Sequence, residues 1–124
     1  MRDFVWISLG AILGANLRYL VSRLAARHLS AALPWGTLIV NVTGSFILGF
    51  FMIWITDRVL ADPRWRPLIA VGFCGGYTTF SSYSYETFNL LEQGHYGLAA
   101  GNFLGNNLLA LAGVLGGAVV ARVI

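Results

Sequence analysis

The hydrophobic and polar positions divide the 124-residue chain into four long apolar stretches with short polar connections. A helix needs about 20 consecutive apolar residues to cross a bilayer, and each stretch has roughly that length. We therefore predict four transmembrane helices, at about residues 4–24, 35–55, 68–91 and 96–120. Because the connections are short, consecutive helices should pack antiparallel, which places both termini on one side of the membrane.

The amino-acid composition supports a membrane protein. Hydrophobic residues make up 57% of the chain and charged residues only 10%, whereas an ordinary soluble domain is about 25% charged. A soluble domain of this size could not hide so many apolar side chains, and disorder requires the opposite composition. We expect one all-α domain over residues 1–124. Its single cysteine, Cys74, cannot form an internal disulfide or a thiolate metal site.

All eight basic residues are arginines, and most lie at the ends of the apolar stretches. This placement favours anchoring at the membrane interface over binding of nucleic acid. The side that holds the termini carries Arg2, Arg58, Arg64, Arg66 and Arg122, and the other side carries Arg23 and Arg27. The bias mildly favours cytoplasmic termini, and it is small enough to leave insertion in both orientations open.

Polar residues recur inside the predicted spans at four-residue spacing, which places them on single helix faces. These stripes contain Thr37, Asn41 and Ser45 in the second stretch, and Asn102 and Asn106, with Asn107 beside them, in the fourth. Burying an unpaired polar group in hydrocarbon costs on the order of several kcal/mol, so each of these side chains needs a partner. Two interpretations stay open: hydrogen bonds between helices, or amide donors that receive an anion.

The third stretch contains the sequence Gly72-Phe73-Cys74-Gly75-Gly76-Tyr77-Thr78-Thr79-Phe80, followed by three serines within four residues. Adjacent glycines and hydroxyl side chains are poor material for a continuous helix. We predict a break in mid-membrane near residues 75–79, with Thr79 as the N-cap of the second half. Backbone groups freed at that depth must be met by protein, water or an ion.

Two charged residues, Arg18 and Glu86, lie deep in the predicted spans. They could form a buried ion pair, or Arg18 could supply positive potential to an aqueous vestibule. Glycines also recur at four-residue spacing, for example at Gly10 and Gly14 or Gly113 and Gly117. Such pairs let helix backbones touch, either within the chain or at a subunit interface.

The sequence shows no catalytic triad, metal-ligand cluster or phosphate loop, so we do not expect an enzyme. One alternative is a small proton-coupled multidrug or cation exporter, which needs a carboxylate within the membrane. The first stretch has no interior acidic residue, which leaves Glu86 as the remaining candidate. A second alternative is a non-transporting assembly subunit whose polar stripes only dock helices.

Three motifs carry a resemblance to a known family: Gly10-x3-Gly14-x3-Arg18-Tyr19, Gly36-Thr37-Leu38-x2-Asn41-x2-Gly44-Ser45, and the run from Gly72 to Ser81. With these motifs, and over essentially its whole length, the chain resembles the Fluc or CrcB family of small fluoride channels. The resemblance implies an antiparallel, dual-topology homodimer in the bacterial inner membrane, with two pores that both subunits line. It implies passive, selective export of cytoplasmic fluoride, which reduces fluoride toxicity.

The resemblance also implies particular site residues. Fluoride would be met by Asn41 and by the ring edge of Phe80, because aromatic rings have positive edges. A structural sodium ion would lie at the dimer centre, bound by the backbone carbonyls of Gly75 and Thr78. The complete predicted pore set is Asn41, Phe80, Tyr83, Ser81, Thr79, Asn106 and Arg18. Two positions depart from the family pattern: Tyr83 replaces a second pore phenylalanine, and Ala110 stands where a hydroxyl is expected.

Overall fold

The computed structural model describes residues 2–57 and 62–124, and these residues are almost entirely helical. Helix α1 covers Arg2–His28 and α2 covers Trp35–Asp57. The third helical stretch consists of the π-helical segment η1 (Arg66–Cys74), α3 (Gly75–Tyr77) and α4 (Phe80–Glu92). The fourth helical stretch is continuous and consists of α5 (Tyr96–Leu104), the π-helical segment η2 (Gly105–Leu109) and α6 (Ala110–Val123). Arg58, one of the counted arginines, lies outside the described residues.

Three of these helices are long and apolar enough to cross a membrane: Arg2–His28, Trp35–Asp57 and Tyr96–Val123. The remaining predicted span is helical too, but it is divided between η1–α3 and α4. The predicted all-α architecture is therefore confirmed, and the chain is a multi-pass membrane protein.

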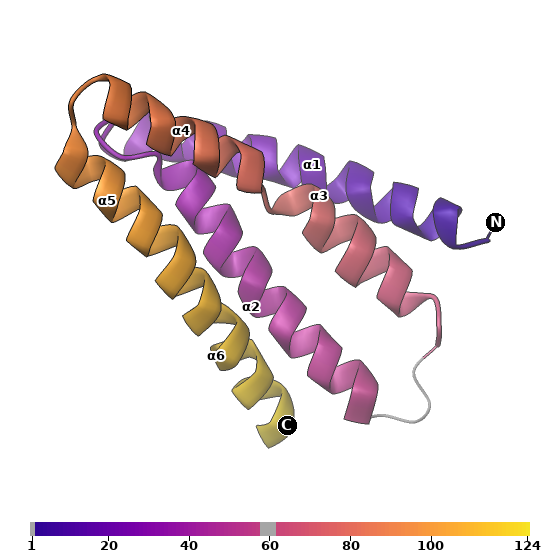
Figure 1. The fold of residues 1–124 in the computed structure, drawn as a ribbon. Helices are drawn as coiled ribbons and strands as arrows, with labels where there is room; N and C mark the ends of the chain where they lie inside the picture. Colours follow the sequence, from indigo (N-terminus) through magenta and orange to yellow (C-terminus); the bar gives the residue numbers. More distant parts are fainter. Residues whose placement is uncertain (1, 58–61) are drawn as a thin grey trace.

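The helices run alternately in opposite directions (Figure 1). Both termini lie at the end of the bundle opposite the turn between α1 and α2 and the turn between α4 and α5. Helix α2 packs along α6, and α1 packs along η1 and α3. These two pairs are joined by contacts of α2 with α1 and with η1, so α2 lies at the centre of the bundle.

Glycines account for the close approach of these helices. A Cβ atom at Gly14 would clash with the carbonyl oxygen of Phe73, and one at Gly117 would clash with that of Phe46. Within a single chain, these glycines therefore let α1 touch η1 and α6 touch α2. Gly101 differs, because no described atom outside its own stretch of helix lies within 4 Å of the position its Cβ would take.

The third helical stretch is interrupted at Thr78 and Thr79. Both have extended backbones, with φ and ψ of −80° and 161° at Thr78 and −151° and 118° at Thr79. The Thr79 hydroxyl accepts a hydrogen bond from the backbone N–H of Ser82, which confirms the predicted N-cap. The predicted limits of the break, 75–79, were too wide, because Gly75 is helical at φ −64° and ψ −35°. Gly76 instead lets the backbone of Ala11 approach.

Candidate functional site

A cavity of about 320 Å³ lies beside the interruption, between α2, the third helical stretch and η2; we call it the central cavity. Its lining contains amide, hydroxyl and aromatic side chains but, among the residues that the structure describes, no charged side chain. Its polar and aromatic lining comprises Asn41, Ser45, Thr78, Thr79, Phe80, Tyr83, Asn106 and Asn107, with Gly75 and Ala110 among the small residues. The amide and hydroxyl groups of this lining can both donate and accept hydrogen bonds.

The side-chain amide of Asn41, on α2, forms hydrogen bonds with both the backbone N–H and the backbone carbonyl of Thr79. The Thr79 N–H donates to Asn41 Oδ1 over 2.8 Å, and Asn41 Nδ2 donates to the Thr79 carbonyl oxygen over 3.1 Å. These bonds replace the helical partners that the extended backbone lacks. The second N–H of the same amide donates to Asn106 Oδ1 over 2.8 Å. Asn41 therefore fixes the position of the interruption against α2.

Asn106 extends this network away from the cavity. Its Nδ2 donates to the carbonyl oxygen and to Oδ1 of Asn102, each over 3.0 Å. Asn102 is completely buried and donates in turn to Thr87 Oγ1 over 2.9 Å. The polar stripe of the last span thus forms hydrogen bonds between helices, as the first of the two open interpretations proposed.

Two aromatic residues on α4 border the central cavity. Phe80 directly follows the N-cap and leaves 78% of its surface exposed, whereas Tyr83 is buried. Their rings pack edge to face, with centroids 5.4 Å apart. The Tyr83 hydroxyl oxygen accepts a hydrogen bond from Asn107 Nδ2 over 3.0 Å. The phenol is therefore held in place from η2.

Two predicted pore residues, Arg18 and Ser81, do not line the central cavity. Arg18 contacts a residue of the cavity wall, because its guanidinium donates to the Thr78 carbonyl oxygen over 3.3 Å. Ser81 is exposed on the first turn of α4, where its hydroxyl lies 3.4 Å from Thr79 Oγ1. The other predicted positions, Gly75 and Thr78 among them, are brought together around the cavity.

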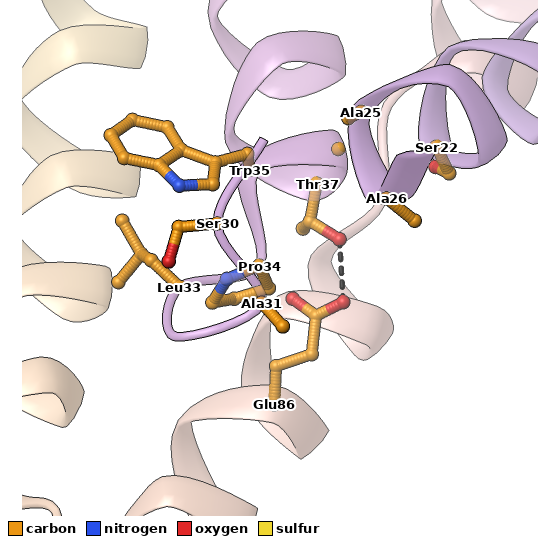
Figure 2. A pocket seen from close by; sticks show the side chains of 11 residues that line it. Ser22, Ala25, Ala26, Ser30, Ala31, Leu33, Pro34, Trp35, Thr37 and Glu86 are labelled. Carbon is orange, nitrogen blue, oxygen red and sulfur yellow. Dashed lines mark hydrogen bonds between the residues drawn. The ribbon is translucent and has the colours of Figure 1, made fainter. Parts of the chain in front are cut away.

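A second cavity, of about 320 Å³, lies at the turn between α1 and α2, and Glu86 reaches into it from α4 (Figure 2). Glu86 Oε1 accepts a hydrogen bond from the Thr37 hydroxyl over 2.6 Å. Its Oε2 is buried and has no hydrogen-bond partner among the described residues. The suggested Arg18–Glu86 ion pair is wrong, because each side chain binds a different partner.

Ser45 and Asn107 were not among the predicted pore residues, although both belong to or flank the polar stripes of the sequence. The stripe spacing places Ser45 one turn beyond Asn41, and this position is what brings it to the cavity wall. Four-residue periodicity could thus have identified Ser45, whereas nothing in the sequence pairs Asn107 with Tyr83.

Comparison with known proteins identifies the family. A family model described as CrcB-like protein, Camphor Resistance (CrcB), matches residues 5–118. The chain is 54% identical over 122 residues to the "Fluoride-specific ion channel FluC" of Koribacter versatilis, which covers 98% of this chain and 97% of that protein. It is 45% identical over 124 residues to the protein of the same name from Sulfurihydrogenibium, with both chains fully covered. A third relative of this name, from Roseiflexus, is 46% identical over 98% of each chain. The chain therefore belongs to the CrcB-like family.

Proposed function

We propose that this protein is a fluoride channel that lets cytoplasmic fluoride leave the cell passively and selectively. The observation that carries the proposal is the central cavity, where amides, hydroxyls and two aromatic rings meet at an interrupted helix. Relatives that match almost the whole chain are named fluoride-specific ion channels. The protein has the role of a channel in the bacterial inner membrane and not that of an enzyme.

The chemistry of the cavity fits a small anion. Fluoride binds water strongly, so a pathway through the membrane must replace that water with other donors. Hydroxyl groups donate hydrogen bonds, and the edge of the Phe80 ring carries partial positive charge. The Arg18 guanidinium adds positive potential behind the Thr78 carbonyl. Asn41 contributes directly to fluoride binding only when the anion displaces one of its present acceptors.

The pathway requires a second copy of the chain in our proposal, arranged antiparallel to the first. Phe80 lines the central cavity and is nevertheless 78% exposed, so the cavity is open beside it in a single chain. The second copy would supply the missing wall and place the interruption at Thr78–Thr79 in mid-membrane. Two cavities related by symmetry would then give two pores.

A structural sodium ion at the centre of this dimer is part of the proposal. Two observations support this: the Thr78 carbonyl lies outside regular helix, and Gly75 lines the central cavity with no described atom within 4 Å of where its Cβ would lie. One chain offers these two carbonyl oxygens, and the same two from a symmetry-related second copy would bring the oxygen ligands to four. The site is therefore complete only with a partner. Sodium would also compete with the Arg18 guanidinium for the Thr78 carbonyl.

The test is efflux from vesicles reconstituted with the purified chain and loaded with fluoride or chloride. A fluoride electrode should record rapid fluoride release once a potassium ionophore relieves the charge imbalance, while a chloride electrode records no release above protein-free vesicles. Equal release of both anions would contradict selectivity. Proton-coupled cation uptake would point to the exporter, and no transport at all would point to an assembly subunit.

A further inference from the structure

Most hydrogen-bond donors that line the central cavity are already used within the chain. Both N–H groups of Asn41 donate, one to the Thr79 carbonyl and one to Asn106 Oδ1. The Asn106 amide nitrogen donates to the Asn102 carbonyl and side-chain oxygen. In this arrangement, neither amide has a donor left for an anion.

The threonines and Asn107 are committed in the same way. The Thr78 hydroxyl donates to the Cys74 carbonyl over 2.8 Å, and the Thr79 hydroxyl donates to Ser82 Oγ over 3.0 Å. Asn107 Nδ2 donates to the Phe103 carbonyl over 2.7 Å and to the Tyr83 oxygen over 3.0 Å. These three side chains also have no spare N–H or O–H group.

Two lining hydroxyls keep a free hydrogen. Tyr83 accepts from Asn107, and its own hydrogen has no acceptor among the residues that the structure describes. The Ser45 hydroxyl forms no hydrogen bond within the same part of the chain. Both residues line the central cavity, Ser45 from α2 and Tyr83 from α4. The cavity thus offers two unused O–H donors on different helices.

We propose that the hydroxyls of Ser45 and Tyr83 donate hydrogen bonds to fluoride in the central cavity, and that Asn107 is a positioning residue for Tyr83. This inference rests on the proposed function. It adds two donors that need not break an existing bond, whereas Asn41 and Asn106 also hold the interruption in place. Phe80, whose ring lies against Tyr83, adds its positive edge beside the phenol.

The experiment compares Tyr83→Phe and Ser45→Ala with wild type in reconstituted vesicles, measuring the fluoride concentration that gives half-maximal efflux. A hydrogen bond to a charged group contributes enough that each loss should raise this concentration about tenfold or more. Ser45→Thr, which keeps the hydroxyl, should restore the wild-type value. Matched controls are Tyr77→Phe, whose hydroxyl pairs with Thr43 instead, and Ser8→Ala, an exposed serine on α1. Both controls should leave the value unchanged.

A further variant, Asn107→Leu, tests the positioning role. It should weaken fluoride binding when Tyr83 is present and have no added effect in the Tyr83→Phe background. Monodisperse gel filtration of every variant separates these effects from misfolding. A wild type that conducts fluoride, together with Tyr83→Phe and Ser45→Ala variants that match it, would overturn this inference and leave the channel intact. A wild type that does not conduct would overturn the proposed function itself.

Discussion

The side chain of Asn41 and the backbone of Thr79 form a reciprocal pair of hydrogen bonds, 2.8 Å and 3.1 Å long, between α2 and the interruption of the third helical stretch. The pair satisfies a peptide N–H and a carbonyl that would otherwise lie unpaired in a partly buried position. Each unsatisfied group of this kind costs about 1–3 kcal/mol. Asn41 is therefore important for the shape of the cavity before any ion enters it.

Replacing Asn41 with aspartate should abolish fluoride efflux while the protein still assembles. Asn41→Asp keeps the acceptor for the Thr79 N–H but loses both donors and places a negative charge beside the Thr79 carbonyl and Asn106 Oδ1. The charge repels an anion in the cavity. Fluoride-electrode efflux from vesicles measures the loss, and gel filtration measures assembly.

The matched control for this charge is Asn89→Asp, at an exposed position of α4 away from the central cavity. It should retain efflux close to wild type. If Asn41→Asp conducts as well as Asn89→Asp, Asn41 neither borders the pathway nor shapes it.

Local signals predicted the fold well. Each predicted apolar stretch is helical. Thr79 was correctly identified as an N-cap, because a threonine hydroxyl can accept a hydrogen bond from the N–H three residues ahead, here that of Ser82. The adjacent glycines misled the placement of the break. Gly76 faces the backbone of Ala11, so its lack of a side chain serves packing and not a turn. A sequence shows that a glycine is small but not which of these uses it has.

The partners within the site could not be predicted to the same degree. The sequence places both Arg18 and Glu86 deep in predicted spans, which suggested an ion pair. In the structure, Arg18 instead donates to the Thr78 carbonyl, and Glu86 accepts from the Thr37 hydroxyl. Both contacts join residues far apart in the chain, and they depend on how the helices rotate about their axes. Periodicity gives the face of a helix that is polar, whereas the partner of each side chain is decided by tertiary packing.

Close helix contact predicts a clear difference between two glycines. Gly14→Ala should lower the thermal stability of the detergent-solubilised protein, because the new methyl group meets the Phe73 carbonyl of η1. Overpacking of this kind costs about 1–3 kcal/mol. Gly101→Ala should be neutral or slightly stabilising, because the new methyl group meets no other described part of the chain within 4 Å and alanine favours helix by about 1 kcal/mol over glycine. Equal destabilisation of both variants would contradict the packing of α1 against η1.

The loop that precedes η1 predicts a dependence on pH. Hydrogen bonds from the Arg64 side chain and backbone lower the pKa of Asp62 from 3.8 to about 2. Because the folded pKa lies below the unfolded one, the carboxylate stabilises the fold above about pH 4, and this contribution disappears as the pH falls towards 2. Asp62→Asn should therefore unfold at a slightly lower temperature than wild type at pH 7 and at the same temperature near pH 2. Added salt should shrink the difference at pH 7, because the pair is exposed. A difference that persists unchanged to pH 2 would exclude this ion pair as its source.

The exposed ring of Phe80 provides the sharpest test of the pathway. In a single chain, 78% of the Phe80 surface is exposed, so Phe80→Ile removes little packing within the chain, and gel filtration of the variant checks that its assembly is unchanged. Isoleucine has no aromatic edge to place against an anion, so fluoride efflux should fall by at least about tenfold if that edge contributes as much as a hydrogen bond to a charged group. Phe4→Ile, at a phenylalanine of α1 that is 71% exposed, makes the same chemical change far from the cavity and should conduct normally. If both variants lose efflux to the same extent, or neither does, the Phe80 ring has no role in permeation beyond that of any apolar residue at the surface of the bundle.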